Sequence, residues 1–94
     1  MAKPEKLIEK WKNSRPTDVR KGEVETVLNG YFDGEWDHDG GSHIVVRNEI
    51  LKRYREYQPY GEFTIAIKGG QKVKGVYVKE IIKAISLIQD SKEE

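Results

Sequence analysis

Residues 63–88 read FTIAIKGGQKVKGVYVKEIIKAISLI and contain the clearest structural pattern in this 94-residue chain. From Phe63 to Lys68 apolar and polar side chains alternate, which is typical of a β-strand with one buried face. After the glycine pair at 69–70, apolar residues recur at helical spacing, at Val78, Ile81, Ile82, Ile85 and Ile88. A strand followed by an amphipathic helix predicts a sheet whose apolar face is covered by a helix.

The segment before residue 63 predicts two more strands, at 31–37 and 42–47, because aromatic and β-branched residues are frequent in both. Glycines in the intervening 39–41 turn can adopt the positive φ angles of a tight hairpin. Side chains alternate along the second strand, as in any pleated strand. We therefore expect two sets of side chains on it, with Ile44 and Val46 toward the helices and His43, Val45 and Arg47 on the opposite face.

Two helices are expected ahead of the strands, each with one apolar stripe. The first covers residues 3–13, and the second covers 21–29 and ends at Gly30. The order of helix, helix, three antiparallel strands and helix predicts an α+β fold, a two-layer sandwich with the helices on one face of a three-stranded antiparallel sheet. We expect a single domain over 1–94, whose last residues, 89–94, form a charged tail.

Composition excludes some chemistry and leaves the partner open. The chain has no cysteine, so disulfides and thiolate catalysis are excluded. Seventeen Lys and Arg stand against 16 Asp and Glu, and a net charge of +1 does not by itself argue for nucleic acid. No apolar stretch near the start is long enough for a signal peptide or a membrane span, so we expect a cytoplasmic protein with no membrane partner.

Two segments together resemble the HicA family of small RNA-cleaving toxins. The first is Gly40-Gly41-Ser42-His43, and the second is the apolar strand, basic turn and closing helix that follow about twenty residues later. In that family a Gly-Ser-His on a hairpin strand precedes such a strand, turn and helix, and the resemblance covers roughly 19–88. The chain departs from the family by Ile44 in place of a second histidine, by Gly75 in place of a proline, and by an insertion at 50–62.

The resemblance implies both a fold and a function. It implies a double-stranded-RNA-binding type of fold with an extra N-terminal helix, and an activity that cleaves messenger RNA without a metal. It also implies that His43 is the catalytic histidine. The partners it implies are RNA and a HicB-like antitoxin protein that covers the site.

The chemistry of RNA cleavage agrees with this set of residues. RNA carries its own nucleophile, the 2′-hydroxyl, so an enzyme needs a base for that proton, cations for the phosphate and an acid for the leaving oxygen. An imidazole can be the base, and helix amino termini favour phosphate. The sequence identifies no acid, and His38, Tyr77 or water are the alternatives. The expected RNA contacts are Gly41, Ser42, Arg47, Lys68, Lys72, Lys74 and Lys79.

Other interpretations of the same residues stay open or are rejected. The Asp37-His38-Asp39 triplet is read as a turn and not as a metal site, because successive strand residues point to alternate faces. Gly69-Gly70 lacks the spacing of a phosphate loop, so no cofactor is expected. The lysines alone fit a solvated face, and the tyrosines at 54, 57 and 60 fit simple packing. The alternatives to the toxin are a non-catalytic module that binds RNA or protein, and a solitary relative without toxicity.

Overall fold

The structure is a computed structural model and describes residues 3–38 and 42–92. Its helices are α1 (Pro4–Ser14), α2 (Lys21–Tyr31) and α3 (Gly75–Lys92), with two short 3-10 turns, η1 (Ile50–Arg53) and η2 (Arg55–Tyr57). Its strands are β1 (Asp18–Arg20), β2 (Trp36–His38), β3 (His43–Arg47), β4 (Glu62–Ala66) and β5 (Lys72–Lys74).

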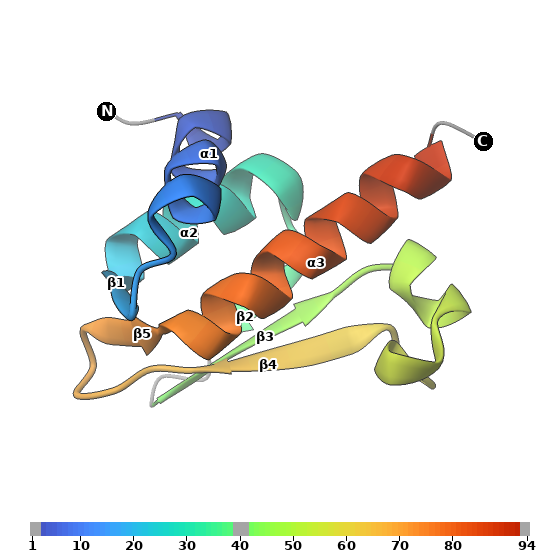
Figure 1. Cartoon of the computed structure of the whole chain (residues 1–94). Coiled ribbons are helices and arrows are strands. Elements are labelled where there is room, and N and C mark those ends of the chain that lie inside the picture. Colours follow the sequence, from blue (N-terminus) through green and yellow to red (C-terminus); the bar gives the residue numbers. More distant parts are fainter. Residues whose placement is uncertain (1–2, 39–41, 93–94) are drawn as a thin grey trace.

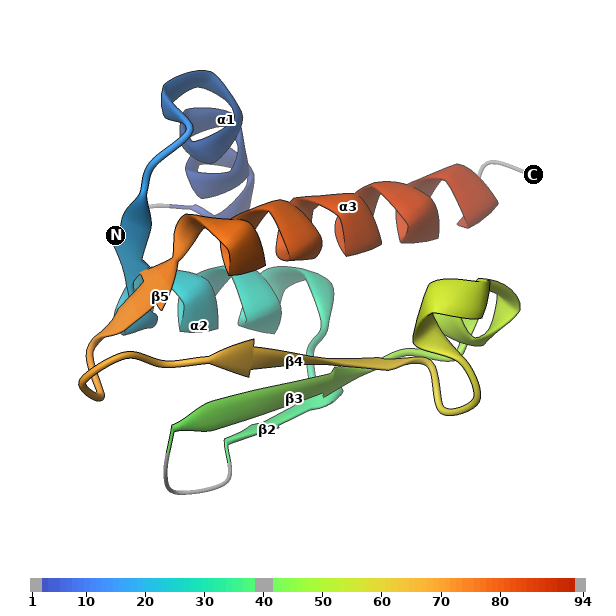
Figure 2. The same cartoon turned by 60° about the horizontal axis from the view of Figure 1, so that its bottom comes forward.

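One layer of the fold is an antiparallel sheet in the order β2-β3-β4, as the sequence predicts (Figure 1). Helices α2 and α3 lie on one face of this sheet, and α1 packs on the far side of α2 (Figure 2). The predicted α+β fold with helices on one sheet face is therefore confirmed. The opposite face of the sheet carries no other element among the described residues, so its side chains are open to solvent (Figure 2).

The buried side chains form one contiguous core between the sheet and the helices. Alternation along β3 is as expected, because Ile44 and Val46 are fully buried while His43 and Arg47 are exposed. Each predicted helical stripe contributes to the core. These stripes supply Leu7, Ile8 and Trp11 from α1, Val24, Val27 and Leu28 from α2, and Val78, Ile81, Ile85 and Ile88 from α3. Ile82 differs from the expectation, since it lies at the edge of the stripe and is only partly buried.

The strand predicted at 31–37 is wrong over most of its length. Tyr31 is the last residue of α2, and the amide of Phe32 donates a 2.7 Å hydrogen bond to the carbonyl of Leu28, so helical pairing continues past the predicted end. Only residues 36–38 pair with β3. Gly30 lies inside the helix and does not end it, and a side chain there would collide with the ring of Pro4 in α1. Its role is close packing between two helices.

The charged tail predicted at 89–94 is also corrected, because α3 continues to Lys92. The hydroxyl groups of Tyr54 and Ser91 lie 3.1 Å apart, within hydrogen-bond distance. This contact joins the end of α3 to the segment between β3 and β4. Residues 93–94, like the predicted hairpin turn at 39–41, lie outside the described residues.

A second, two-stranded sheet was missed by the sequence analysis. Strands β1 and β5 pair antiparallel, with Asp18 opposite Lys74 and Arg20 opposite Lys72. Both strands read polar-apolar-polar, and their central valines, Val19 and Val73, point into the core. Three residues are too few for a periodic signal, so the pairing is visible only in the folded chain.

The insertion at 50–62 folds into the two 3-10 turns and packs against the core. Tyr57 is buried and contacts Phe63 edge to face, with ring centroids 5.9 Å apart. Tyr54 is partly buried and Tyr60 is exposed. The packing interpretation is therefore correct for Tyr54 and Tyr57.

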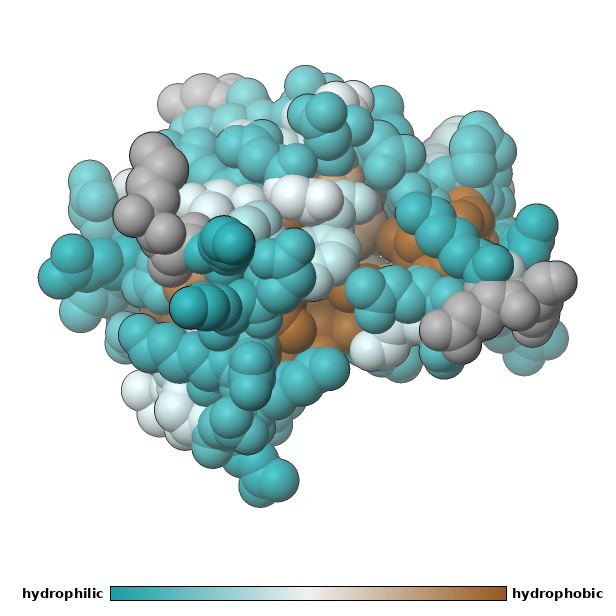
Figure 3. All heavy atoms as spheres, turned by 90° about the horizontal axis from the view of Figure 1, so that it is seen from above, coloured by the Kyte–Doolittle hydropathy of each residue, from teal (hydrophilic) through white to brown (hydrophobic). Residues whose placement is uncertain are grey.

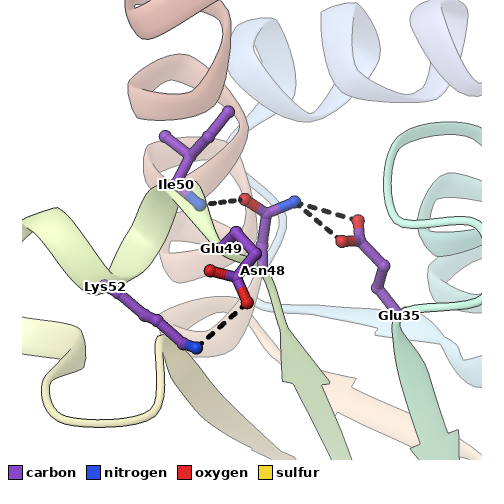
Figure 4. A network of polar contacts seen from close by, with 5 residues as sticks. All are labelled: Glu35, Asn48, Glu49, Ile50 and Lys52. Atoms are coloured by element: carbon purple, nitrogen blue, oxygen red, sulfur yellow. Dashed lines mark hydrogen bonds and ion pairs between the residues drawn. The ribbon is translucent and has the colours of Figure 1, made fainter.

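The junction between β3 and η1 is organised by one asparagine (Figure 4). The side-chain amide of Asn48 donates to both carboxylate oxygens of Glu35, at 2.9 and 3.1 Å, and its oxygen accepts from the amide of Ile50 at 2.8 Å. Glu49 and Lys52 form an ion pair beside it. These contacts hold the start of β2, the end of β3 and the first 3-10 turn together, at the end of the sheet away from His43 (Figure 4).

Candidate functional site

His43 is the first residue of β3 and lies on the open face of the sheet. In the register of β3 and β4 it is opposite Ala66, and its side chain is exposed. The hydroxyl oxygen of Ser42 lies 3.3 Å from Nδ1 of the His43 ring, close enough for a hydrogen bond in which either group can be the donor. This neighbour restricts the ring orientation. The imidazole is thus on the surface, with Ser42 as one of its neighbours, and an exposed imidazole is a group that can act as a base.

Four lysines predicted as RNA contacts come together around one groove. Lys68, Lys72, Lys74 and Lys79 all line a hollow of about 700 Å³ between the α1–β1 connection and the start of α3. Lys72 and Lys74 project from β5, and Lys79 from the second turn of α3. Arg15, which the sequence analysis did not single out, lines the same groove. The groove therefore gathers five cationic side chains from three separate segments.

These five cations differ from three other cations of the chain, which form ion pairs. Among the described residues, none of the five has a carboxylate oxygen within 4 Å of a side-chain nitrogen. In contrast, Arg47, Lys52 and Lys83 are paired with Glu62, Glu49 and Glu56. The groove lining includes one carboxylate, Asp18. A concentration of unneutralised cations in a concave surface attracts anions, even though the whole chain has a net charge of only +1.

Lys68 connects the groove with His43. The ladder between β3 and β4 continues past Ala66, since the amide of Ile67 donates a 2.6 Å hydrogen bond to the carbonyl of Ser42. Lys68 follows two residues after Ala66, the partner of His43 in the register, and forms the bridge to Lys72 that begins the turn into β5. Figure 2 shows the start of β3, β5 and the first turn of α3 at the same end of the molecule.

Of the two remaining predicted contacts, Arg47 lies away from this site and Gly41 is not described. Arg47 lies at the opposite end of β3, four residues and therefore about 13 Å from His43. Its Nε donates to Oε2 of Glu62 at 2.6 Å, and this hydrogen bond, with the carboxylate charge, raises the guanidinium pKa. Gly41 lies outside the described residues.

Neither predicted candidate for the general acid is on the same side of the sheet as His43. His38 pairs with Ile44 in the register, so alternation directs it to the helical face, whereas His43 is on the open face. Tyr77 belongs to α3, which covers the helical face (Figure 2).

Metal and membrane sites can be assessed only for the described part of the chain. Within residues 3–38 and 42–92, no three His, Asp or Glu side chains gather as a metal-binding set. Asp39 of the Asp-His-Asp triplet is not among them. Over the same residues, no helix combines the length and the apolar character that crossing a bilayer requires.

A smaller hollow of about 250 Å³ lies between α1 and α3, lined mainly by apolar groups such as Trp11, Val78 and Ile82. Figure 3 views this helical side and shows patches of apolar surface among hydrophilic residues. The hollow shares Arg15 and Lys79 with the basic groove, so the two form neighbouring concave surfaces.

The sequence analysis missed the groove residues Arg15, Asp18 and Val76. Asp-Val-Arg at 18–20 and Lys-Val-Lys at 72–74 carry the same alternating pattern, which is the only signal that the two segments could pair.

Comparison with known proteins does not assign this chain to a family, because no protein-family model, no curated protein and no solved structure matches it.

Proposed function

We propose that this protein binds RNA in the basic groove and cleaves it without a metal, with His43 as the general base. The observation that carries the proposal is that five cations, none of them in an ion pair within the described part of the chain, line one groove, and that one of them, Lys68, follows two residues after Ala66, the partner of the exposed His43 in the sheet. Cations in this arrangement would hold the phosphates of a strand that passes from the groove onto the open sheet face.

The proposed reaction uses the nucleophile that RNA itself supplies. His43 takes the proton of a 2′-hydroxyl, the 2′-oxygen attacks the neighbouring phosphorus, and the bond from phosphorus to the 5′-oxygen breaks. The products are a 2′,3′-cyclic phosphate and a 5′-hydroxyl, whose proton comes from water. Lys68, which lines the groove, is the cation proposed to offset the charge that develops on the phosphate.

Together with the resemblance of residues 19–88, this arrangement supports membership in the HicA-like toxins and a fold of the double-stranded-RNA-binding type. On this proposal the substrate is messenger RNA, the protein acts in the cytoplasm, and a HicB-like antitoxin silences it by covering His43. The open face of β2-β3-β4 is the surface that such a partner would cover (Figure 2).

A second function is favoured by one specific observation. His38 and Tyr77, the two side chains considered as general acids, belong to the helical side of the sheet, away from His43. A protein that only binds RNA needs no acid. The second candidate is therefore an RNA-binding module that uses the same groove and does not cut its ligand.

One experiment separates the two candidates. Purified protein is incubated with RNA in excess chelator, beside the His43→Ala variant, and both proteins are expressed in growing cells. The nuclease proposal expects cleavage and growth inhibition by the native protein alone. Tight RNA binding without cleavage by either protein would support the binding module.

A further inference from the structure

The basic groove is lined by apolar side chains as well as by cations. Val76, in the first turn of α3, is 60% exposed, an unusual degree for a large apolar side chain in this protein. It lines the groove beside Pro16, which contributes a second apolar surface. Because these apolar groups lie in the same groove as the cations, the groove has the mixed chemistry of a site for a ligand that is partly anionic and partly apolar.

The dimensions of the groove match a small organic ligand. Its volume of about 700 Å³ falls within the ~300–1,000 Å³ that is usual for such sites. A nucleotide has the required combination, with a phosphate for the cations and a sugar and base for the apolar surface. A base becomes available to such a surface only when it is unstacked, as in a single strand.

We propose that the groove is a subsite for one unstacked nucleotide of single-stranded RNA, adjacent to the phosphate at His43. Val76 and Pro16 contact the sugar or base, while Arg15 and Lys79 bind its phosphate. Lys68 then directs the next phosphate to the histidine. The inference rests on the proposed RNA function and adds a recognition site to it.

One side of this subsite lies outside the part of the chain that resembles HicA. Arg15, Pro16 and Asp18 precede residue 19 and are held in place by local structure. Arg15 ends α1 in a left-handed conformation with φ of 46°, and its amide donates a 3.0 Å hydrogen bond to the carbonyl of Trp11. Asp18 pairs with Lys74 in the small sheet. The connection that follows the N-terminal helix is thus built into the groove, which gives it a role in selecting the substrate.

The test measures binding alone. A short fluorescent 2′-O-methyl oligoribonucleotide, which the proposed reaction cannot cleave, is titrated as a single strand and as a duplex with its complement, at several salt concentrations. The variants are Arg15→Gln, Lys79→Gln and Val76→Ser. The matched control is Lys52→Gln, which removes an exposed cation at η1, far from the groove. Circular dichroism melting checks that each variant folds.

For the single strand, Arg15→Gln and Lys79→Gln should each raise Kd about fivefold and flatten the salt slope by roughly 0.7. Val76→Ser should raise Kd by about two- to fivefold with an unchanged salt slope, because it removes an apolar contact and no charge. The Kd for the duplex should stay the same in Val76→Ser, and Lys52→Gln should leave the Kd for both ligands unchanged.

Several outcomes would overturn the subsite. They are an unchanged single-strand Kd in Val76→Ser, the same loss for duplex and single strand in that variant, or an equal loss in Lys52→Gln. If these occur while RNA is still cut through His43, the subsite is wrong and the proposed function stands. If the groove variants behave as expected but no RNA is cut, the subsite stands and the catalytic proposal fails.

Discussion

The backbone amide of Gly75 donates a 2.7 Å hydrogen bond to the carbonyl of Thr17, which ties the first residue of α3 to the segment that precedes β1. The two backbones approach so closely that a Cβ on Gly75 would lie 2.5 Å from the carbonyl oxygen of Pro16. A proline at 75, the residue expected there from the resemblance to HicA, could not donate this hydrogen bond. The glycine therefore belongs with the N-terminal segment that this chain adds to the basic groove.

Gly75→Ala is expected to destabilise the protein by about 1–3 kcal/mol, because the new methyl group must displace the backbone of Pro16. RNA binding should weaken with it, since the groove wall moves. Gly22→Ala is the matched control in α2, where an added Cβ meets nothing within 4 Å. Helix propensity should make this control neutral or more stable by up to about 1 kcal/mol. Urea denaturation of both variants measures the difference, and equal stabilities would contradict it.

Periodicity explains why most of the fold could be predicted. The stripes of α1, α2 and α3 and the alternation of β3 and β4 are local signals, and each led to the correct element. The errors arose where a tertiary contact decides. Gly30 signals the end of a helix in isolation, but it lies within α2 because Pro4 packs on it. Strands β1 and β5 are each other's pairing partners, in a sheet of two strands, so neither can be recognised from its own three residues.

The candidate site was predictable to a similar degree. Lysines 68, 72, 74 and 79 are neighbours in sequence, so their common groove follows from one strand, one turn and one helix start. Arg15 and Asp18 are at least fifty residues away from them, and the pairing of β1 with β5 brings this segment to the groove. The prediction for Arg47 identified its sheet face correctly, since it shares the face of His43. It failed because Arg47 lies at the opposite end of β3.

The core of the protein should depend on Ile81 more than on its neighbour Ile82. Ile81 is fully buried, so Ile81→Ala should cost on the order of 2–5 kcal/mol. Ile82 is only partly buried and lines the hollow beside α1, so Ile82→Ala should cost less. His43→Ala should change the free energy of unfolding by no more than about 0.5 kcal/mol, as expected for an exposed residue. A large loss in that variant would show that His43 is structural.

Tyr57→Phe should stabilise the protein. The Tyr57 hydroxyl is buried and has no hydrogen-bond partner among the described residues, so its removal should gain on the order of 1 kcal/mol at neutral pH. Burial, with Glu80 and Glu56 nearby, raises the pKa of Tyr57 above its ordinary 10.0 despite the opposing effect of Lys83. The folded state thus retains a proton that the unfolded state loses, and stability falls as pH rises above 10. The advantage of the variant should therefore widen above pH 10 in urea titrations, and a constant difference would contradict the burial of this group.

Lys68→Ala and Arg47→Ala should differ in their effect on RNA binding. Lys68 lines the groove without a carboxylate partner among the described residues, so its loss should raise Kd for all sequences alike and flatten the salt slope by roughly 0.7. Arg47 is already paired with Glu62, and its loss should change the slope less. Lys72→Ala and Lys74→Ala should behave like Lys68→Ala. Anisotropy titrations over a range of salt test the order, and a steeper loss for Arg47 would move the RNA to the other end of β3.

The most direct test of the central claim compares one RNA with the same RNA carrying a single 2′-deoxy sugar at the cut, both in excess chelator. The native protein should cleave only the first, leaving a 2′,3′-cyclic phosphate or its hydrolysis product, because attack by the neighbouring hydroxyl requires no activated water. His43→Ala should reduce the rate by ~10²–10⁴, the usual contribution of a positioned base. Cleavage of the 2′-deoxy substrate, full activity in His43→Ala, or activity that is lost with chelator and restored by a divalent metal would contradict the proposed mechanism.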